Sequence, residues 1–314
     1  MSLLTRYLTD ALKAQLSQRV TPNGYRLEDV IRSGVRHADS RIGIYAPDFE
    51  SYDVFRELFG PIVENFKAPA PAHHTDLAYI DPAAVVSTRI RVARNLTGHA
   101  FPSVMSRQQR LAVEEAITQA CKTLAPDFEG TVTPLGHLPQ AALNDMVSKR
   151  QAFGPDDKYM AAAGIHDDWP LGRSVFNTHA GHLSIWINEE DHLRVAVVMP
   201  GACVAACQEA MTFVMSRLAA SLDFCSDAEF GYLTSCPSNV GTGLRASYRI
   251  DKSLKAPQTG TLERLEAAGY LQLRSPSGEH AAQGGELVDV GLRRRVGLSG
   301  RDTLEGMKAL LSRR

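Results

Sequence analysis

The sequence predicts an α+β protein with two parts: a small all-α N-terminal domain, and a larger domain in which α-helices flank a mainly antiparallel β-sheet. Apolar residues recur at helical spacing through the first 66 positions, whereas from Val85 onward short alternating runs are separated by hairpin-like turns. The 314 residues, 44% of them hydrophobic, suffice to build a core for both parts. We therefore divide the chain into a domain at 1–66, a linker at 67–82 and a second domain at 83–314.

The N-terminal helices are predicted from three sets of apolar residues, which indicate three or four short helices. The sets are Leu4, Leu8, Ala11 and Leu12; Leu27, Val30, Ile31 and Val35; and Tyr52, Phe55, Phe59, Ile62, Val63 and Phe66. Between the last two sets lies a compact loop, residues 39–48, in which Asp48 is placed to cap the next helix. Prolines and a lack of periodicity mark 67–82 as a linker, so its adjacent His73 and His74 are interpreted as exposed histidines and not as a metal site.

Strands and helices alternate in the second domain. Residues 86–92 alternate in polarity, which places Arg89 and Arg91 on one face of a strand and Ile90 and Val92 on the other. Further strands are predicted at 183–187, 193–198, 230–233, 244–250, 270–274 and 287–290. Helices are predicted after the capping box at Ser106, at 202–222, around Leu262 and Leu265, and after Ser299.

The composition excludes several classes of protein. The net charge is −1 and the pI is about 6.8, so no basic field would recruit nucleic acid. No apolar run approaches the roughly 20 residues of a membrane span, and the first residues do not read as a secretory signal. The five cysteines form no CxxC pair, which favours free thiols in a reducing cytoplasm. The sequence leaves a monomer and a homodimer open.

Arginines recur where the predicted strands end or turn, and they are Arg89, Arg91, Arg194, Arg245 and Arg274. A triphosphate concentrates several negative charges in a small volume, and transfer of its terminal group requires those charges to be neutralised and aligned. The chain has no GxxxxGK[ST], and Gly241-Thr242-Gly243 is not GxGxxG. If phosphate binds, a group of arginines holds it and not a P-loop.

Carboxylates accompany these arginines. Glu189-Glu190-Asp191 occupies a predicted hairpin tip, and Glu279 lies in a loop after Arg274. Carboxylates beside an arginine-rich site indicate a cationic second substrate, and a planar guanidinium would donate paired hydrogen bonds to them. Cys236 would then lie near positive charge, which favours its thiolate. Surface carboxylates that merely balance the arginines would give the same pattern.

Five segments resemble motifs of the phosphagen (ATP:guanidino) kinases, and the arginine kinases among them most closely, in the order that the family shows. They are the guanidino-specificity loop at 39–48, Ser87-Thr88-Arg89-Ile90-Arg91, Asn188-Glu189-Glu190-Asp191-His192-Leu193-Arg194, Cys236-Pro237-Ser238-Asn239 with Gly241-Thr242-Gly243-Leu244-Arg245, and Gly278-Glu279-His280. The resemblance covers nearly the whole chain. It implies the glutamine-synthetase/guanido-kinase-like fold, and reversible transfer of the ATP γ-phosphoryl group to the guanidino nitrogen of free L-arginine, giving phosphoarginine and ADP.

The resemblance also implies a role for each matched residue. The phosphates of the nucleotide would be bound by Arg89, Arg91, Arg194, Arg245 and Arg274. The guanidinium would be held by Glu190 and Glu279, one of which would accept its proton. The thiolate of Cys236 would also contact it. The amino-acid end of the substrate would be bound by Ser40, Ile42, Gly43 and Tyr45. Mg²⁺ would be held by nucleotide oxygens and water, so no protein ligand to the metal is expected.

Other readings share part of this pattern. A kinase for taurocyamine or creatine would carry the same motifs, and a protein-arginine kinase would carry those of the second domain without the N-terminal helices. A non-catalytic arginine or nucleotide sensor belongs to a different class, and no catalytic position is visibly lost here. Three residues depart from the family pattern: Arg150 stands near the nucleotide where a histidine is usual, Ser238 stands where a threonine is more common, and Lys158 replaces an arginine that would pair with Asp39 across the domains.

Overall fold

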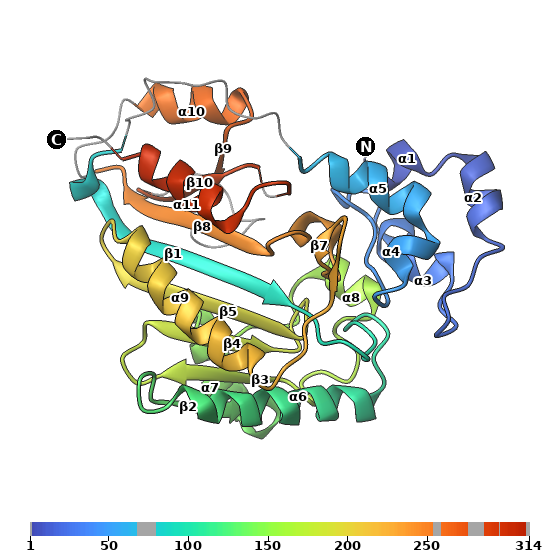
Figure 1. The fold of residues 1–314 in the computed structure, drawn as a ribbon, viewed down its shortest axis with the longest axis horizontal. Coiled ribbons are helices and arrows are strands. Elements are labelled where there is room, and N and C mark those ends of the chain that lie inside the picture. The colour runs from blue at the N-terminus through green and yellow to red at the C-terminus, as the bar shows by residue number, and fades with distance from the viewer. Residues whose placement is uncertain (1, 68–79, 254–258, 276–285, 295, 312–314) are drawn as a thin grey trace.

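The computed structural model describes residues 2–67, 80–253, 259–275, 286–294 and 296–311, and it has the predicted α+β architecture. A helical lobe made by the N-terminal residues lies beside a larger lobe that is built on an eight-stranded sheet. In Figure 1 the helical lobe is blue and lies beyond the C-terminal end of the long central strand β1 (Val85–Arg94). None of the helices in these described ranges is both long and apolar enough to cross a membrane.

The described part of the helical lobe contains five helices where the sequence predicts three or four. They are α1 (Leu3–Tyr7), α2 (Asp10–Leu16), α3 (Leu27–Arg36), α4 (Ser51–Val54) and α5 (Arg56–Glu64). The first apolar set spans two helices, because the Thr9 hydroxyl accepts the N–H of Leu12 and starts α2. Asp48 lies before α4, and its carboxylate accepts the N–H of Ser51, the first residue of that helix, over 2.9 Å, although Glu50 occupies the N-cap position.

Two glycines bring the loop after α3 onto that helix. The N–H of Gly34 donates to the carbonyl oxygen of Gly43 over 3.0 Å, and a Cβ on Gly34 would lie 2.5 Å from that oxygen. Gly43 has a φ of +88°, and a Cβ there would lie 2.8 Å from the Cβ of Leu4. Only glycine meets both requirements without strain. The loop at 39–48 is therefore fixed against α1 and α3.

The sheet of the larger lobe is antiparallel throughout, with β1 and β8 near its middle. Its strands, in spatial order, are β2 (Gly130–Pro134), β3 (Ser174–Thr178), β4 (Leu183–Ile187), β5 (Leu193–Pro200), β1, β8 (Leu244–Asp251), β10 (Leu287–Leu292) and β9 (Leu271–Arg274). The strand predicted at 230–233 is reduced to a short ribbon of β6 (Ser226–Asp227) and β7 (Gly231–Tyr232). The sequence did not predict β2 or β3.

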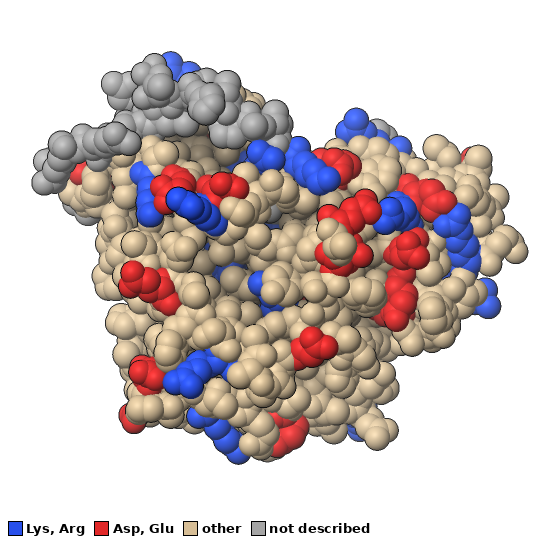
Figure 2. Space-filling model, viewed as in Figure 1, with Lys and Arg blue, Asp and Glu red and all other residues tan. Residues whose placement is uncertain are grey.

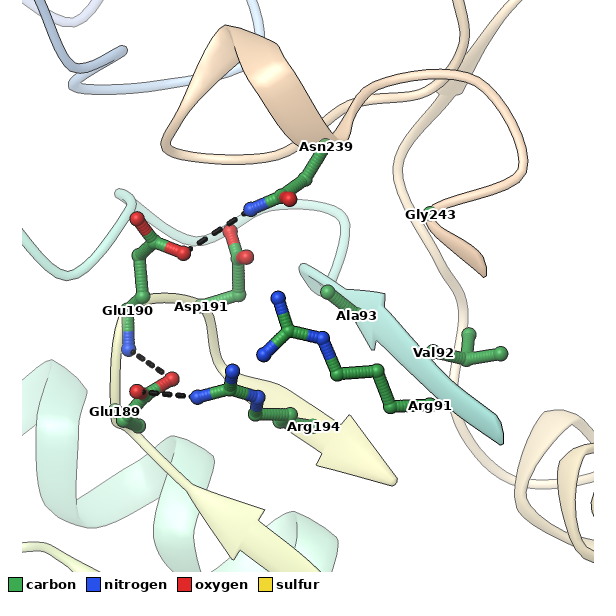
Figure 3. A pocket seen from close by; sticks show the side chains of 9 residues that line it. All are labelled: Arg91, Val92, Ala93, Glu189, Glu190, Asp191, Arg194, Asn239 and Gly243. Carbon is green, nitrogen blue, oxygen red and sulfur yellow. Dashed lines mark hydrogen bonds and ion pairs between the residues drawn. The ribbon is translucent and has the colours of Figure 1, made fainter. Parts of the chain in front are cut away.

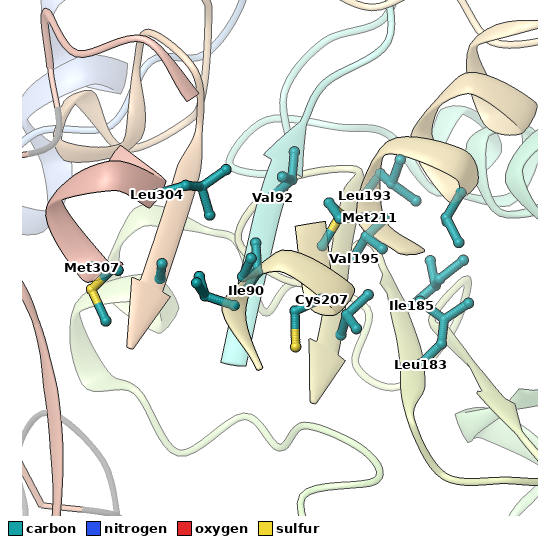
Figure 4. Close-up of a cluster of buried hydrophobic side chains, with 14 of the residues drawn as sticks. Ile90, Val92, Leu183, Ile185, Leu193, Val195, Cys207, Met211, Leu304 and Met307 are labelled. Carbon is teal, nitrogen blue, oxygen red and sulfur yellow. The ribbon is translucent and has the colours of Figure 1, made fainter. Parts of the chain in front are cut away.

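One face of this sheet is covered by helices and holds the main core. The covering helices are α6 (Arg107–Cys121), α9 (Val204–Ala219), α10 (Thr259–Ala267) and α11 (Gly300–Ala309). Ile90 and Val92 of β1 point into this core beside Met211 of α9 and Leu304 of α11 (Figure 4). The predicted alternation of β1 is confirmed for its central residues, because Ile90 and Val92 share this face and Arg89 and Arg91 take the other.

Among the described residues, helices cover the opposite face near β3 and β4. There Val175 and Trp186 pack with Leu143 of α7 (Gln140–Ser148), and α8 (Lys158–Ala163) lies farther on, against α3 of the helical lobe. The sequence predicted neither helix. The outward face of the central strands β5, β1, β8 and β10 consequently carries the less buried half of each alternating pattern, which includes most of their arginines.

The two lobes share a hydrophobic core. Buried residues of α3, α4 and α5 form one cluster with residues of the larger lobe, namely Phe101, Cys225, Phe230, Leu233, Val240 and Val296. At its edge Arg56 pairs with Glu229 over 2.5 Å and lies over the ring of Phe230. Figure 2 shows acidic and basic side chains interspersed across the face drawn there, without a broad patch of one sign.

Candidate active site

The uncovered face of the sheet collects all five predicted arginines. Arg91 of β1 lies opposite Arg245 of β8, and Arg89 lies opposite Ser247. Arg194 of β5 lies between two buried residues, and Arg274 follows buried Leu273 at the end of β9, so both project to this same face. Burial lowers the pKa of Arg89, and its arginine neighbours add to that effect while Asp289 opposes it. Such crowding of cations favours an anionic ligand.

Arg249 and Asp289 extend this face, and the sequence analysis did not single them out. Their Cα atoms pair directly across β8 and β10, and Nε and Nη2 of Arg249 donate to the two carboxylate oxygens over 2.8 and 3.0 Å. Asp289 in turn lies opposite Arg274. The clue available in the sequence was position, because Arg249 follows Arg245 by four residues on one alternating strand.

Arg150 lies near this group, just beyond the end of α7. Its φ is +59°, and burial lowers its pKa while the charge of Arg249 adds to the effect and that of Asp289 opposes it. Its position near the arginine face agrees with its predicted proximity to the nucleotide site. The pair of Arg249 and Asp289 supplies part of its electrostatic surroundings.

The tip between β4 and β5 brings carboxylates to the edge of the arginine face. Glu189 and Arg194 form an ion pair of 2.5 Å, and Figure 3 shows it below Glu190 and Asp191. Burial raises the pKa of Glu189 to about 7, and the negative charges of Asp191 and Asp157 contribute to that increase. The tip is therefore sensitive to added or removed charge near neutral pH.

Asp191 attaches this tip to the loop that carries Cys236. One of its carboxylate oxygens accepts the N–H of Ser235 over 2.6 Å and the side-chain amide of Asn95 over 2.8 Å. The Asp191 side chain is buried, so these hydrogen bonds are shielded from water. The hydrogen bonds of Asp191 therefore fix the position of Cys236 relative to Glu190.

Cys236 is buried beside the hydroxyl of Ser238, with the sulfur 3.2 Å from Ser238 Oγ. Burial raises the pKa of the Cys236 thiol to about 12, and the nearby Glu190 contributes, while Arg245 opposes the increase. The thiolate expected from nearby positive charge is therefore not favoured in this arrangement. The prediction of a thiolate took into account the positive charge of the arginines. It did not take into account the burial of the sulfur or the negative charge of neighbouring Glu190.

The predicted substrate loop lies directly against the cysteine. Ile42 and Tyr45 share a small apolar cluster with Cys236, and the N–H of Ala46 donates to the carbonyl of Ser235 over 2.7 Å. Burial raises the pKa of Tyr45 well above its usual value, and the negative charge of nearby Glu190 adds to the increase. The fold thus brings Tyr45, Cys236 and Glu190 together, with Ser40 and Gly43 buried in the same loop.

A small pocket of about 10 Å³ lies where the carboxylates meet the arginines. Its lining residues, drawn in Figure 3, are Arg91, Val92, Ala93, Glu189, Glu190, Asp191, Arg194, Asn239 and Gly243. Gly243 has a φ of +61°, and a Cβ there would lie 2.7 Å from the carbonyl oxygen of Ala93, so glycine permits the close approach of β8 to β1. Glu279, the remaining predicted catalytic residue, lies outside the described residues.

The expected pair between the lobes is present. Lys158 Nζ lies 2.5 Å from the carboxylate of Asp39, and the hydroxyl of Tyr159 donates to the same carboxylate over 3.1 Å. Both charged side chains are more than half exposed, so water screens the attraction. Its contribution is to orient α8 toward the substrate loop more than to stabilise the fold.

Two family models match the chain along most of its length. The model described as "ATP:guanido phosphotransferase, N-terminal domain" matches residues 1–64, and "ATP:guanido phosphotransferase, C-terminal catalytic domain" matches residues 112–313. The chain belongs to the ATP:guanido phosphotransferase family. As a member of this family, it is an ATP:guanidino phosphotransferase, and the predicted resemblance is confirmed.

Relatives within the ATP:guanido phosphotransferase family include several arginine kinases. The arginine kinase of Limulus polyphemus is 33% identical, and the match covers 95% of this chain and 87% of that protein. The arginine kinase of Anthopleura japonica is 34% identical, with 99% of this chain covered, but the chain spans only 46% of that protein.

Solved structures in the family have the same fold. Lombricine kinase has a TM-score of 0.85 at 30% identity, covering 98% of this chain and 88% of that one. The duplicated taurocyamine kinase from Schistosoma mansoni, with bound transition state analog components, has a TM-score of 0.86 at 29% identity, covering 98% of this chain and 45% of that one. The names of these relatives thus include three guanidino substrates.

Proposed function

We propose that this protein is an arginine kinase, which reversibly transfers the γ-phosphoryl group of ATP to the guanidino nitrogen of free L-arginine. The observation that carries the proposal is the meeting of two unlike surfaces at one place. Arginines of the sheet face lie on one side, and Glu190, Cys236 and Tyr45 lie on the other. Similarity to arginine kinases over nearly the whole chain supports the choice of substrate.

The arginine face would hold the nucleotide. Its members would neutralise the phosphates of ATP and the phosphoryl group in transit, and they are Arg89, Arg91, Arg194, Arg245 and Arg274. Phosphoryl transfer depends on positioning and on stabilisation of charge, so a rigid sheet is a suitable platform for these donors. Arg194 would have to exchange its partner Glu189 for phosphate, and the raised pKa of Glu189 reduces the cost of that exchange.

The carboxylate side would hold the guanidinium. Glu190 would accept hydrogen bonds from the arginine substrate and remove its proton, with Glu279 as its expected partner. Cys236 would contact the guanidinium from the other side, and a bound cation there would lower the pKa of its thiol from the raised value. The sulfur would orient and polarise the substrate without a covalent intermediate.

Ser40, Ile42, Gly43 and Tyr45 would receive the amino-acid end of the substrate. The close packing of this loop on α3 and on Ser235 limits the length of that end. The loop is therefore the feature that would distinguish free arginine from larger guanidino compounds.

Magnesium would accompany ATP. Within the described ranges no three His, Cys, Asp or Glu residues are grouped to hold a metal ion. The cation would be bound mainly by phosphate oxygens and water. The ion would neutralise charge on the phosphates, while the arginines position them.

We also propose that residues 1–66 form the domain that receives the guanidino substrate, 67–82 the linker, and 83–314 the catalytic domain that binds ATP. The five cysteines of the chain are free, which supports a cytoplasmic location. The acting unit would be a monomer or a homodimer that needs ATP or ADP and arginine as partners, without nucleic acid or membrane.

A panel of guanidino compounds tests the substrate. With Mg-ATP, we expect the purified protein to phosphorylate L-arginine with a higher kcat/KM than lombricine, taurocyamine or creatine. Turnover of lombricine or taurocyamine without turnover of arginine would favour the second candidate, a kinase for those compounds, which the similar solved structures support. Phosphorylation of protein-bound arginine alone would instead indicate a protein-arginine kinase.

A further inference from the structure

Asn239 contacts both halves of the site. Its side-chain N–H donates to Oε2 of Glu190 over 3.0 Å, and its side-chain oxygen accepts a hydrogen bond from Nη2 of Arg245. Figure 3 shows the first of these bonds, with the amide above the pocket and pointing at Glu190. A single amide thus joins the carboxylate assigned to the guanidinium with an arginine assigned to the phosphates.

The local fold leaves this amide little freedom to turn elsewhere. Asn239 ends the short 3-10 helix η4 (Pro237–Asn239), and its backbone N–H donates to the carbonyl of Cys236 over 3.1 Å. Only 8% of the residue is exposed, so water competes weakly for its side chain. The neighbouring Ser238 hydroxyl also reaches Arg245, but over 3.4 Å and without contact to Glu190.

The chemistry requires a side chain with a donor at one end and an acceptor at the other. Asparagine offers both in one plane, whereas aspartate offers two acceptors and alanine offers neither. A donated hydrogen bond stabilises the ionised carboxylate, which is the form that a proton acceptor needs. An acceptor on the other side holds the Arg245 guanidinium in a fixed orientation.

We propose that Asn239 is a positioning residue that keeps Glu190 ionised and aligned while it fixes Arg245, so that both substrates are aligned through one amide. This proposal rests on the proposed function, since it assumes that Glu190 and Arg245 serve opposite substrates. It adds a connection between them that neither the motif nor the family similarity specifies.

Other charged groups also face Glu190 and set the background for its titration. They come from the hairpin tip, from β1 and β5, from the cysteine loop and β8, and from the helical lobe, and they are Glu189, Asp191, Arg91, Arg194, Cys236, Arg245, Tyr45 and Tyr52. Substitution of Asn239 changes none of these groups. A change in the pH profile of the variant would therefore come from the amide position itself.

Asn239→Asp separates the two contacts, because aspartate keeps the acceptor for Arg245 but presents a second negative charge to Glu190. We expect the acidic limb of the pH profile of kcat/KM for arginine to move upward by about one pH unit or more. At neutral pH kcat should fall about 10- to 100-fold, with partial recovery at higher pH. Asn144→Asp on exposed α7, which likewise keeps its acceptor (for Gln140), serves as the matched control and should leave the profile unchanged.

Two further measurements keep the outcome decisive. If Asn239→Asp does not fold, as judged by circular dichroism, then Asn239→Ala is measured instead, and its acidic limb should also move upward. A folded variant with an unshifted limb, or with equal loss at every pH, would overturn the proposal. Absence of guanidino kinase activity in the unsubstituted protein would refute the proposed function instead.

Discussion

Glu190 illustrates at the residue scale how the site divides its tasks. Its neighbours include carboxylates, a thiol and arginines, and its side chain is oriented by Asn239. A carboxylate in such a place can bind a cation and accept a proton, but it cannot bind phosphate. Arg249 lies at the far end of the arginine face, where its guanidinium donates two parallel hydrogen bonds to the carboxylate of Asp289.

Glu190→Gln should separate catalysis from nucleotide binding. Glutamine keeps an oxygen for the Asn239 amide but loses the negative charge and the ability to accept a proton, so kcat should fall by about 10² or more. The affinity for ADP, measured by calorimetric titration, should change less than about threefold, or 0.7 kcal/mol. Glu28→Gln, at an exposed position of α3, is the control. Equal loss of both properties would make Glu190 a structural residue.

Arg249→Met should weaken nucleotide binding with little effect on arginine. The substitution removes a cation from the row that includes Asp289 and Arg274, while methionine preserves most of the side-chain volume. We expect KM for ATP to rise about tenfold, equivalent to 1.4 kcal/mol, and KM for arginine to rise much less. Steady-state kinetics with each substrate varied in turn would measure both. An unchanged KM for ATP would restrict Arg249 to its structural pair with Asp289.

At the scale of elements, the hairpin tip is held by a neutral histidine behind it. Nδ1 of His192 accepts the N–H of Leu96 over 2.9 Å, so its Nε2 carries the proton that is donated to the carbonyl of Ala100. Burial lowers the pKa of His192 to about 3, although the bond to Ala100 opposes that shift. The imidazole therefore joins the tip to the segment after β1 only while it is uncharged.

Acid should destabilise the protein in part through His192. Its folded pKa lies below the ordinary value of about 6.5, so between these values the unfolded chain binds a proton that the folded chain does not. Stability contributed by this residue is present above about pH 6.5 and falls by up to about 1.4 kcal/mol per unit as the pH drops. Urea unfolding at several pH values should show a shallower loss for His192→Gln than for the unsubstituted protein or for exposed His137→Gln. Parallel curves for all three proteins would exclude this role.

The sequence predicted the elements whose periodicity is long or whose ends are marked. The capping boxes at Ser106 and Ser299 both form, and β1, β4, β5 and β8 lie where the alternation placed them. It missed α7, which starts after Pro139 with no side-chain cap and buries only Leu143, so the usual signals are absent. It also missed β2, whose five residues at the sheet edge show no full alternation.

The sequence could predict which arginines share one face of the sheet, but it could not predict the electrostatics of the candidate site. The arginines and Glu190 follow from motif and alternation, since both are local. The high pKa of the Cys236 thiol depends on burial by Tyr45, Met160 and Ile165, which are remote in sequence. The contact of Asn239 with Glu190 likewise depends on the fold, because Glu190 lies on the hairpin tip, remote from Asn239 in sequence.

At the scale of the whole molecule, the two lobes are mechanically joined on the substrate side. The hydroxyl of Tyr52 donates to the carbonyl of Thr234 over 2.7 Å, and Ala46 is bonded to Ser235, so the loop before Cys236 is attached to the helical lobe. Movement between the lobes would carry this loop along. The arginine face, which belongs to the central sheet, would then be the partner that approaches or withdraws.

Phe230→Ala should loosen the helical lobe although the residue belongs to the larger one. Phe230 packs with Tyr52 and lies in the shared core, so truncation should cost about 3 kcal/mol. Hydrogen exchange of amides in α3 and α5 should accelerate in this variant. Phe213→Ala on α9, which packs on Phe128 away from the helical lobe, is the control. Unchanged protection of α3 and α5 would show that the lobes are independent in stability.

The shared core has a consequence for cutting the chain into two fragments. A fragment that ends near Phe66 would expose the apolar faces of α4 and α5, and the remainder would expose Phe230, Leu233 and Val240. Complementary apolar surfaces of this kind allow separate pieces of one fold to reassemble. Co-expressed halves of this protein should therefore find each other and restore the guanidino site without a covalent connection between them.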